Sequence, residues 1–165
     1  MKLIRLHIKD HKLLHDMNLR FDRNHRLDVN ASYRLDFLVG VNGSGKSTLL
    51  RALVEIFSSL QTGTGADFEY ELEYELENHG QPIQVCVKKS LEPMLGFFQV
   101  SSTIHKPDQS SVSIDNPVLD SQYWPENIVV YTTGSEEEWQ NILNMQFDSA
   151  NPVPVDKELL CEPTQ

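Results

Sequence analysis

The sequence predicts an α/β domain in which a strand, a glycine-rich loop and a helix are followed by antiparallel strands. Three observations favour this class. The segment "GVNGSGKS" (residues 40–47) fits the pattern G-x-x-x-x-G-K-[ST], which is typical of phosphate-binding loops. An apolar stretch leads into it, and leucines at helical spacing follow it. Further along, "DFEYELEYELE" (residues 67–77) alternates with the period of a strand.

The composition is that of a globular, water-soluble chain. The 165 residues include 39% hydrophobic ones, and the mean hydropathy is -0.38. No apolar run approaches the roughly 18–20 residues that span a bilayer. The N-terminus lacks the features of a secretory signal. Cys86 and Cys161 have no metal-like spacing and fit a reduced compartment. We therefore expect a cytoplasmic protein without a membrane association.

Charge is distributed unevenly along the chain. The net charge is -10, yet ten of the 14 Lys and Arg residues fall within residues 1–51. This asymmetry has two interpretations: a face for an anionic ligand near the N-terminus, or two oppositely charged surfaces that pack or pair. The overall acidity argues against tight DNA binding by this chain alone.

The N-terminal third predicts two paired strands, a third strand and a helix. Residues 2–9 and 17–22 alternate between apolar and polar side chains, so they should pair across a short connection. Residues 33–40, "YRLDFLVG", end in an apolar cluster that suits a buried strand. From Ser47 onward apolar residues recur at helical spacing until two glycines end the pattern.

Residues 67–77 give the most regular pattern in the chain. Aromatic and leucine side chains occupy one face of the predicted strand, and a row of six carboxylates occupies the other: Asp67, Glu69, Glu71, Glu73, Glu75 and Glu77. Like charges in a row repel, so the row must face water or a basic partner. A strand presents the carboxylates in a line, which argues against convergence on one metal ion.

Further strands and one helix are predicted after the acidic strand. Residues 82–89 read as its returning partner, with Lys88 and Lys89 placed to offset acidic charge. Weaker strand patterns follow at residues 95–104 and 110–115. Residues 127–134 predict a short buried strand, residues 135–147 a helix with Ser135 as N-cap, and residues 151–165 an irregular tail.

The phosphate-binding loop requires its residue types for physical reasons. Glycines at positions 40, 43 and 45 let successive backbone N–H groups point at phosphate oxygens. The helix that follows presents its positive end to the same anion. Lys46 would reach the β- and γ-phosphates of ATP, and the Ser47 hydroxyl would bind Mg²⁺. The predicted nucleotide-binding residues of the loop are Asn42, Gly43, Ser44, Gly45, Lys46, Ser47 and Thr48.

Two N-terminal stretches together resemble a known family. "MKLIRLHIKDHKLLHDMNLRFD" and "LVGVNGSGKSTLLRAL" are similar to the start of ABC-type ATPase heads in structural-maintenance-of-chromosomes and RecF-like proteins. Asn42 matches the form of the loop in that family, whereas Val41 stands where proline is common. The resemblance implies that Lys12, a basic residue in the turn between the first two strands, approaches the nucleotide phosphates.

The resemblance also implies an architecture. Residues 1–150 would form the N-terminal lobe of a P-loop NTPase of the ABC type, with parallel core strands, a phosphate-loop helix and an antiparallel β-subdomain at about residues 67–115. ATP and Mg²⁺ would be its cofactors. A second ATPase head or a homodimer partner would supply a signature motif.

The stretch "PENIVVYTTGSEEEW" further resembles ABC-like ATPases of bacterial anti-phage systems, of the restriction-associated, Septu-like and retron-associated types. The implied role is a nucleotide-driven switch in DNA-related or defence complexes. Such complexes would include an effector protein, and nucleic acid would bind through the complex.

Several parts of a complete ABC head are absent from the sequence. No apolar strand ends in Asp-Glu, and "TTGSE" (residues 132–136) is a poor match to a signature motif. Catalytic residues are therefore unassigned, and we expect ATP binding with little hydrolysis by this chain alone. Three explanations remain open: a truncated ATPase lobe, an interaction module that uses the acidic strand, and a degenerate lobe without nucleotide affinity. Motifs of small GTPases and nucleotide kinases are absent.

Overall fold

The computed structural model describes residues 1–21, 36–78, 80–94, 96–116 and 118–125. The chain divides into two compact units, Met1–Val130 and Tyr131–Gln165. All of the described residues belong to the first unit. The predicted strand at residues 127–134, the helix at 135–147 and the tail at 151–165 lie outside the described residues.

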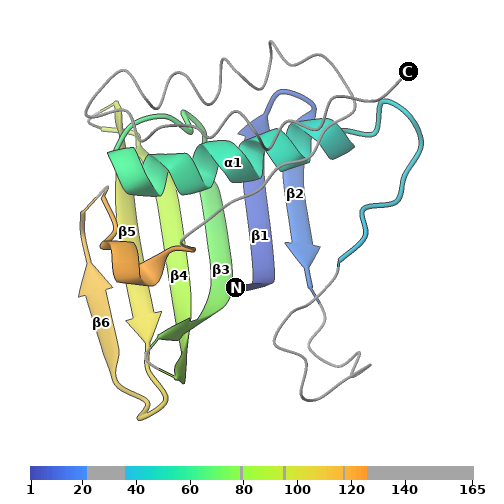
Figure 1. Cartoon of the computed structure of the whole chain (residues 1–165). Coiled ribbons are helices and arrows are strands. Elements are labelled where there is room, and N and C mark those ends of the chain that lie inside the picture. The colour runs from blue at the N-terminus through green and yellow to red at the C-terminus, as the bar shows by residue number, and fades with distance from the viewer. Residues whose placement is uncertain (22–35, 79, 95, 117, 126–165) are drawn as a thin grey trace, which may run out of the picture. The chain divides into compact units, whose positions relative to one another are not determined.

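The described residues form one antiparallel sheet with a helix packed on one face (Figure 1). The strand order is β2-β1-β3-β4-β5-β6, and each pair of neighbours is antiparallel. The elements are β1 (Lys2–His11), β2 (Leu14–Arg20), α1 (Lys46–Thr62), β3 (Tyr70–Asn78), β4 (Gln81–Glu92), β5 (Phe97–His105), β6 (Ser111–Ile114) and the 3₁₀ turn η1 (Ser121–Tyr123).

Most local predictions within these residues are confirmed. β1 and β2 form the predicted hairpin, and α1 begins and ends where the spacing and the glycines indicate. Gly63 caps the C-terminus of α1 with φ 78°, and its N–H donates to the carbonyl of Ser59 at 2.8 Å. The acidic strand is β3, and β4, β5 and β6 follow it in sequence order across the sheet.

The predicted buried strand before the loop is not formed in its described part. Residues 36–41 belong to no strand, and Phe37, Val39 and Val41 are 79%, 94% and 79% exposed. An apolar cluster becomes a buried strand only if other strands pair with it and cover it. None of the described strands pairs with residues 36–41. The parallel core strands of the ABC-type lobe thus have no counterpart among the described residues and remain a prediction.

The core lies between α1 and the inner face of the sheet. Leu6 and Ile8 of β1 and Leu72 of β3 are almost fully buried there. The alternation of β3 therefore points its aromatic and leucine side chains toward the helix. The buried residues that α1 contributes are Leu49, Ala52, Val54, Ile56, Phe57, Ser59 and Leu60.

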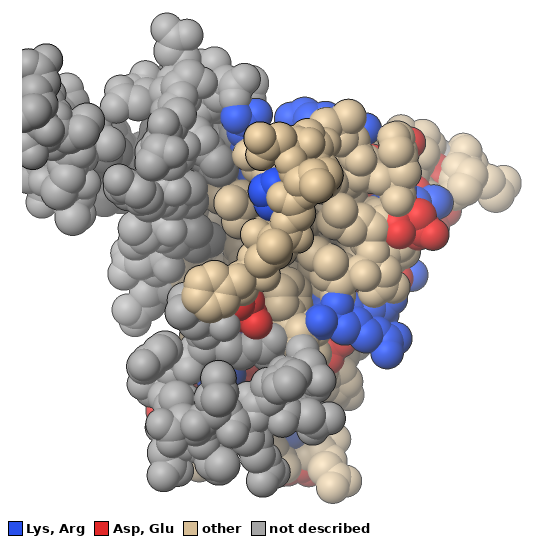
Figure 2. Space-filling view, turned by 90° about the vertical axis from the view of Figure 1, so that its right-hand side faces the viewer, with Lys and Arg blue, Asp and Glu red and all other residues tan. Residues whose placement is uncertain are grey.

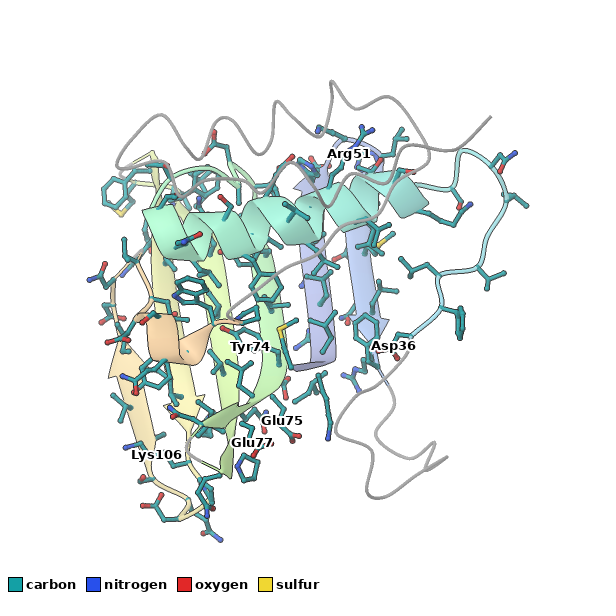
Figure 3. All side chains as sticks on the ribbon, viewed as in Figure 1. Asp36, Arg51, Tyr74, Glu75, Glu77 and Lys106 are labelled. Atoms are coloured by element: carbon teal, nitrogen blue, oxygen red, sulfur yellow. The ribbon has the colours of Figure 1, made fainter. Side chains whose placement is uncertain are left out.

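The segment after β6 closes the core at one end. The Tyr74 hydroxyl donates a hydrogen bond to the carbonyl of Tyr123 at 2.6 Å, and Leu119 N–H donates to the carbonyl of Leu60 at 2.8 Å (Figure 3). Because these bonds join β3 to η1 and α1 to residue 119, they hold the last described residues against the helix–sheet core.

The acidic row faces outward, and several of its carboxylates form ion pairs with basic side chains of neighbouring strands. Lys2 pairs with Glu75 at 3.6 Å, and Lys9 pairs with Glu69 at 2.7 Å. Glu71 lies between two cations, Arg5 of β1 at 3.4 Å and Lys88 of β4 at 3.1 Å. Lys9 stabilises the charged Glu69 carboxylate through a hydrogen bond and so lowers its pKa.

The uneven distribution of charge along the sequence thus largely reflects the pairing of the basic strand β1 with the acidic strand β3. Figure 2 shows blue and red side chains close together on the side of the molecule at the right of Figure 1. Lys89 is an exception to the predicted pairing, because its ammonium group lies on the inner side, donating to the carbonyl of Gly65 at 2.8 Å. Burial lowers the pKa of Lys89.

No helix among the described residues is long and apolar enough to cross a membrane.

Candidate phosphate-binding site

The loop at residues 40–45 has the backbone conformation that its glycines predict. Gly43 and Gly45 have φ values of 82° and 88°, in the left-handed region that other residues rarely adopt. Gly40 has a different role, since a Cβ there would lie 2.8 Å from the Ser44 hydroxyl oxygen. Two glycines therefore shape the turn, and the third leaves room for its close approach.

The Lys46 side chain folds back over this loop. Its Nζ atom donates hydrogen bonds to the carbonyls of Gly40 at 2.7 Å and Val41 at 2.8 Å. These two bonds hold the ammonium group against the glycine-rich turn that precedes α1. A cation held in this way is ready to meet an anion that enters the loop.

The N-terminus of α1 is open to an anion. Gly45 is the N-cap and no side chain caps the helix. An uncapped first turn leaves backbone N–H groups without partners inside the helix, and the helix dipole makes this end positive. Together with Lys46, these donors form a cradle suited to phosphate oxygens.

The β1–β2 hairpin lies against the loop where the loop joins α1. Leu14, the first residue of β2, is 1% exposed, and its Cδ2 atom lies 3.0 Å from the position that a Cβ on Gly45 would take. Gly45 is itself buried, whereas Asn42, Gly43 and Ser44 are exposed. The loop is therefore fixed where it joins the helix and open where a ligand would enter.

The structure brings seven of the predicted site residues together, because they are contiguous from Asn42 to Thr48. Ser47 lies in the first turn of α1 with an exposed side chain, as a metal-binding hydroxyl requires. Within the described residues no group of three His, Cys, Asp or Glu side chains is placed to hold a metal ion. The Lys46 ammonium and the uncapped helix N-terminus thus suit a phosphate group, and Ser47 would offer Mg²⁺ one protein oxygen.

Lys12, the eighth predicted residue, lies in the turn between β1 and β2 with φ 54°. Its Nζ atom is 3.8 Å from the Glu55 carboxylate in the middle of α1. Lys12 is therefore directed at Glu55 of the helix, and it stands two residues before Leu14, which lies beside Gly45.

His11, the last residue of β1, also lies near Glu55. Its Nε2 atom lies 3.8 Å from the other Glu55 oxygen, and its ring stacks on Phe68 with 4.0 Å between centroids. The His11 side chain is 11% exposed, and Nε2 has no hydrogen-bond partner. Burial lowers the pKa of His11, with a smaller opposing effect from Glu55 and a supporting one from Lys12.

The loop was predicted from the sequence, whereas Glu55 and His11 were not. A signal for Glu55 was present, since it is the single acidic residue in the 17-residue helix and it stands in an apolar run. Its pairing with His11 and Lys12, which lie far earlier in the sequence, depends on how the helix crosses the sheet, and the sequence pattern does not determine this crossing.

The chain was compared with known proteins. Residues 1–77 match the family model of an AAA domain, and this match covers β1, β2, the loop, α1 and most of β3. It spans 77 of the 165 residues, just under half. At a coarse level the match supports an ATPase-like P-loop domain that binds nucleotide. No curated protein and no solved structure matches the chain.

A glycine substitution tests the geometry of the loop. Gly45→Ala should destabilise the protein, because alanine at φ 88° costs about 1–2 kcal/mol and its Cβ would also press on Leu14. Gly80→Ala is the matched control, since Gly80 has φ 74° and no atom lies within 4 Å of the position that its Cβ would take. Urea unfolding should show a larger loss for Gly45→Ala; equal losses would mean that the Leu14 contact does not constrain the loop.

The buried histidine makes stability depend on pH. The pKa of His11 is lower in the folded chain than its ordinary value, so the unfolded chain takes up the proton first as pH falls below about 6.5. Stability present at pH 7.5 should therefore decrease toward pH 5.5, by at most about 1.4 kcal/mol per unit of pKa difference. Urea unfolding should show a smaller decrease for His11→Gln. A decrease as large as that of the wild type would exclude His11 as the cause.

Proposed function

We propose that this chain is the N-terminal lobe of an ABC-type ATPase head of the structural-maintenance-of-chromosomes and RecF-like class, acting in the cytoplasm. It holds ATP with Mg²⁺ on the loop at residues 42–48. The observation that carries the proposal is the position of Lys46, whose ammonium group is held over the glycine-rich turn beside an uncapped helix N-terminus. The AAA-domain match over the same residues supports it.

Each loop residue has a defined task in this proposal. Backbone N–H groups of residues 43–48 bind phosphate oxygens, and the Lys46 ammonium exchanges its carbonyl partners for the β- and γ-phosphates. The Ser47 hydroxyl would hold Mg²⁺, and the ion would supply positive charge that offsets the charge of the phosphates.

The proposed site is incomplete for hydrolysis. Phe37, Val39 and Val41 precede the loop as exposed apolar residues, and such residues are usually covered by other strands. Hydrolysis also needs a group that positions water, and no apolar strand pattern in the sequence ends in the Asp-Glu pair that supplies this group in ABC-type heads. We propose that a second head, or a second copy of the chain, completes the site with a signature motif.

The biological setting is part of the proposal and rests on the resemblance of residues 125–139 to anti-phage ATPases. In that setting nucleotide binding and release would switch a complex that includes an effector protein and acts on nucleic acid. Most of this stretch lies outside the described residues.

The second candidate function is a nucleotide-stabilised interaction module that uses the acidic strand. The contacts on the outer face of the sheet favour it less, because Glu69, Glu71 and Glu75 already pair with Lys or Arg on neighbouring strands. A partner would have to displace these pairs. Glu77, at the exposed end of β3, is the member of the row best placed for an outside contact (Figure 3).

Replacement of Lys46 tests the proposal. Lys46→Ala should weaken MgATP binding about tenfold to a hundredfold, the effect of losing a charge-assisted hydrogen bond of roughly 1.5–3 kcal/mol. Isothermal titration calorimetry measures the affinity, and phosphate release measures hydrolysis. The wild-type chain should bind MgATP and hydrolyse it little.

Lys106→Ala is the matched control, because Lys106 is an exposed lysine in the β5–β6 connection (Figure 3). It should bind like the wild type. Equal affinities for wild type and Lys46→Ala would refute the phosphate site. Robust turnover by the isolated chain, abolished by Lys46→Ala, would refute the proposed incompleteness.

A further inference from the structure

Glu55 is shared by two basic side chains, His11 at the end of β1 and Lys12 in the turn that follows. Its Oε1 atom is 3.8 Å from Lys12 Nζ, and its Oε2 atom is 3.8 Å from His11 Nε2. Both separations exceed the length of a hydrogen bond, so each contact is purely electrostatic. The carboxylate therefore attracts both groups without fixing either of them.

The two partners differ in their freedom to move. The Lys12 side chain is 56% exposed, so its ammonium group moves through solvent. The His11 ring is confined against Phe68, and its Nε2 atom is buried without a hydrogen-bond partner. If one partner leaves Glu55, it must be Lys12, and His11 remains facing the carboxylate.

The turn that carries both residues is coupled to the phosphate loop. Leu14 follows two residues after Lys12, and it contacts Gly45 at the start of α1. Glu55 lies on the same helix, nine residues after Lys46. Two anions would therefore compete for the Lys12 ammonium group: the Glu55 carboxylate, and a phosphate group bound at the helix N-terminus.

Building on the proposed function, we propose that Glu55 is a positioning residue that holds Lys12 away from the phosphate loop until nucleotide binds. When the phosphates draw Lys12 away, His11 becomes the cationic partner of Glu55 by taking up a proton at Nε2. Nucleotide binding is then linked to protonation of His11.

The charges around His11 determine the sign of this linkage. It is faced by Glu55 of α1 and by Lys12 of its own turn, while Phe68 contributes an uncharged ring. Arg51 lies one helical turn before Glu55 and projects from α1 (Figure 3). Departure of Lys12 removes a positive charge while the Glu55 carboxylate stays in place, and this favours the protonated ring. The contribution of His11 should therefore make ATP bind more tightly as pH falls.

Calorimetric titration of the 165-residue chain with MgATP at pH 8.0 and 6.0 tests the inference. At pH 8.0, Glu55→Gln should bind MgATP roughly twofold to fivefold more tightly, since an ion pair of this kind no longer competes for Lys12. Lys12→Met should abolish that gain in the double variant. Glu77→Gln, which removes an exposed carboxylate on the outer face of the sheet, should leave affinity unchanged.

The histidine is tested by comparison with its neutral analogue. The terminal phosphate of ATP itself titrates at about pH 6–7, so the informative quantity is the difference between the wild type and His11→Gln. The wild type should gain affinity from pH 8.0 to 6.0 relative to His11→Gln. The pH profile separates this role from a structural one, because a packing defect would weaken binding at both pH values.

Unchanged or weaker binding by Glu55→Gln, or an equal gain in the Lys12→Met background, would overturn the inference. Binding that still depends on Lys46 in that experiment would leave the proposed function intact. Absence of any Lys46-dependent binding by the wild type would refute the proposed function, and this inference with it.

Discussion

The packing of α1 on the inner face of the sheet positions every described residue of the candidate site. Leu49, Ile56 and Leu60 of the helix share one buried cluster with Leu6, Ile8 and Leu72 of the sheet, and this packing holds the helix in place on the sheet. The start of the helix in turn places Gly45 on Leu14 and leaves its first turn uncapped. Without this packing neither the phosphate cradle nor the contact between Glu55 and the β1–β2 turn would form.

The two faces of the sheet differ in how their charged side chains are paired. On the outer face, three of the six carboxylates in the acidic row, Glu69, Glu71 and Glu75, form ion pairs with basic side chains of β1 and with Lys88. Exposed pairs of this kind contribute little to stability individually, but they remove the repulsion within the row. Two cationic side chains near the helix, Lys46 and Lys12, are held by carbonyls and by a carboxylate that a nucleotide phosphate could replace.

Local patterns in the sequence predicted the strands, the helix and the glycine-rich turn, because period, spacing and glycine placement act within a few residues. Predictions that depend on neighbours were less successful. Residues 36–41 have the composition of a buried strand, yet no described strand pairs with them, so they are exposed. That Lys12 approaches the nucleotide phosphates stays a prediction, and in the structure its ammonium group lies 3.8 Å from Glu55 of α1. The lone carboxylate on α1 was visible in the sequence, whereas its partners depend on the crossing of helix and sheet.

Nucleotide should be recognised at the loop, and the β1–β2 turn should respond to it. The most direct measurement is an amide NMR titration of the chain with MgATP. Chemical-shift changes should concentrate at residues 40–48, with a second set at His11, Lys12 and Glu55. Changes confined to the acidic face of β3, or no changes at millimolar MgATP, would contradict the central claim that residues 40–48 form a phosphate-binding site.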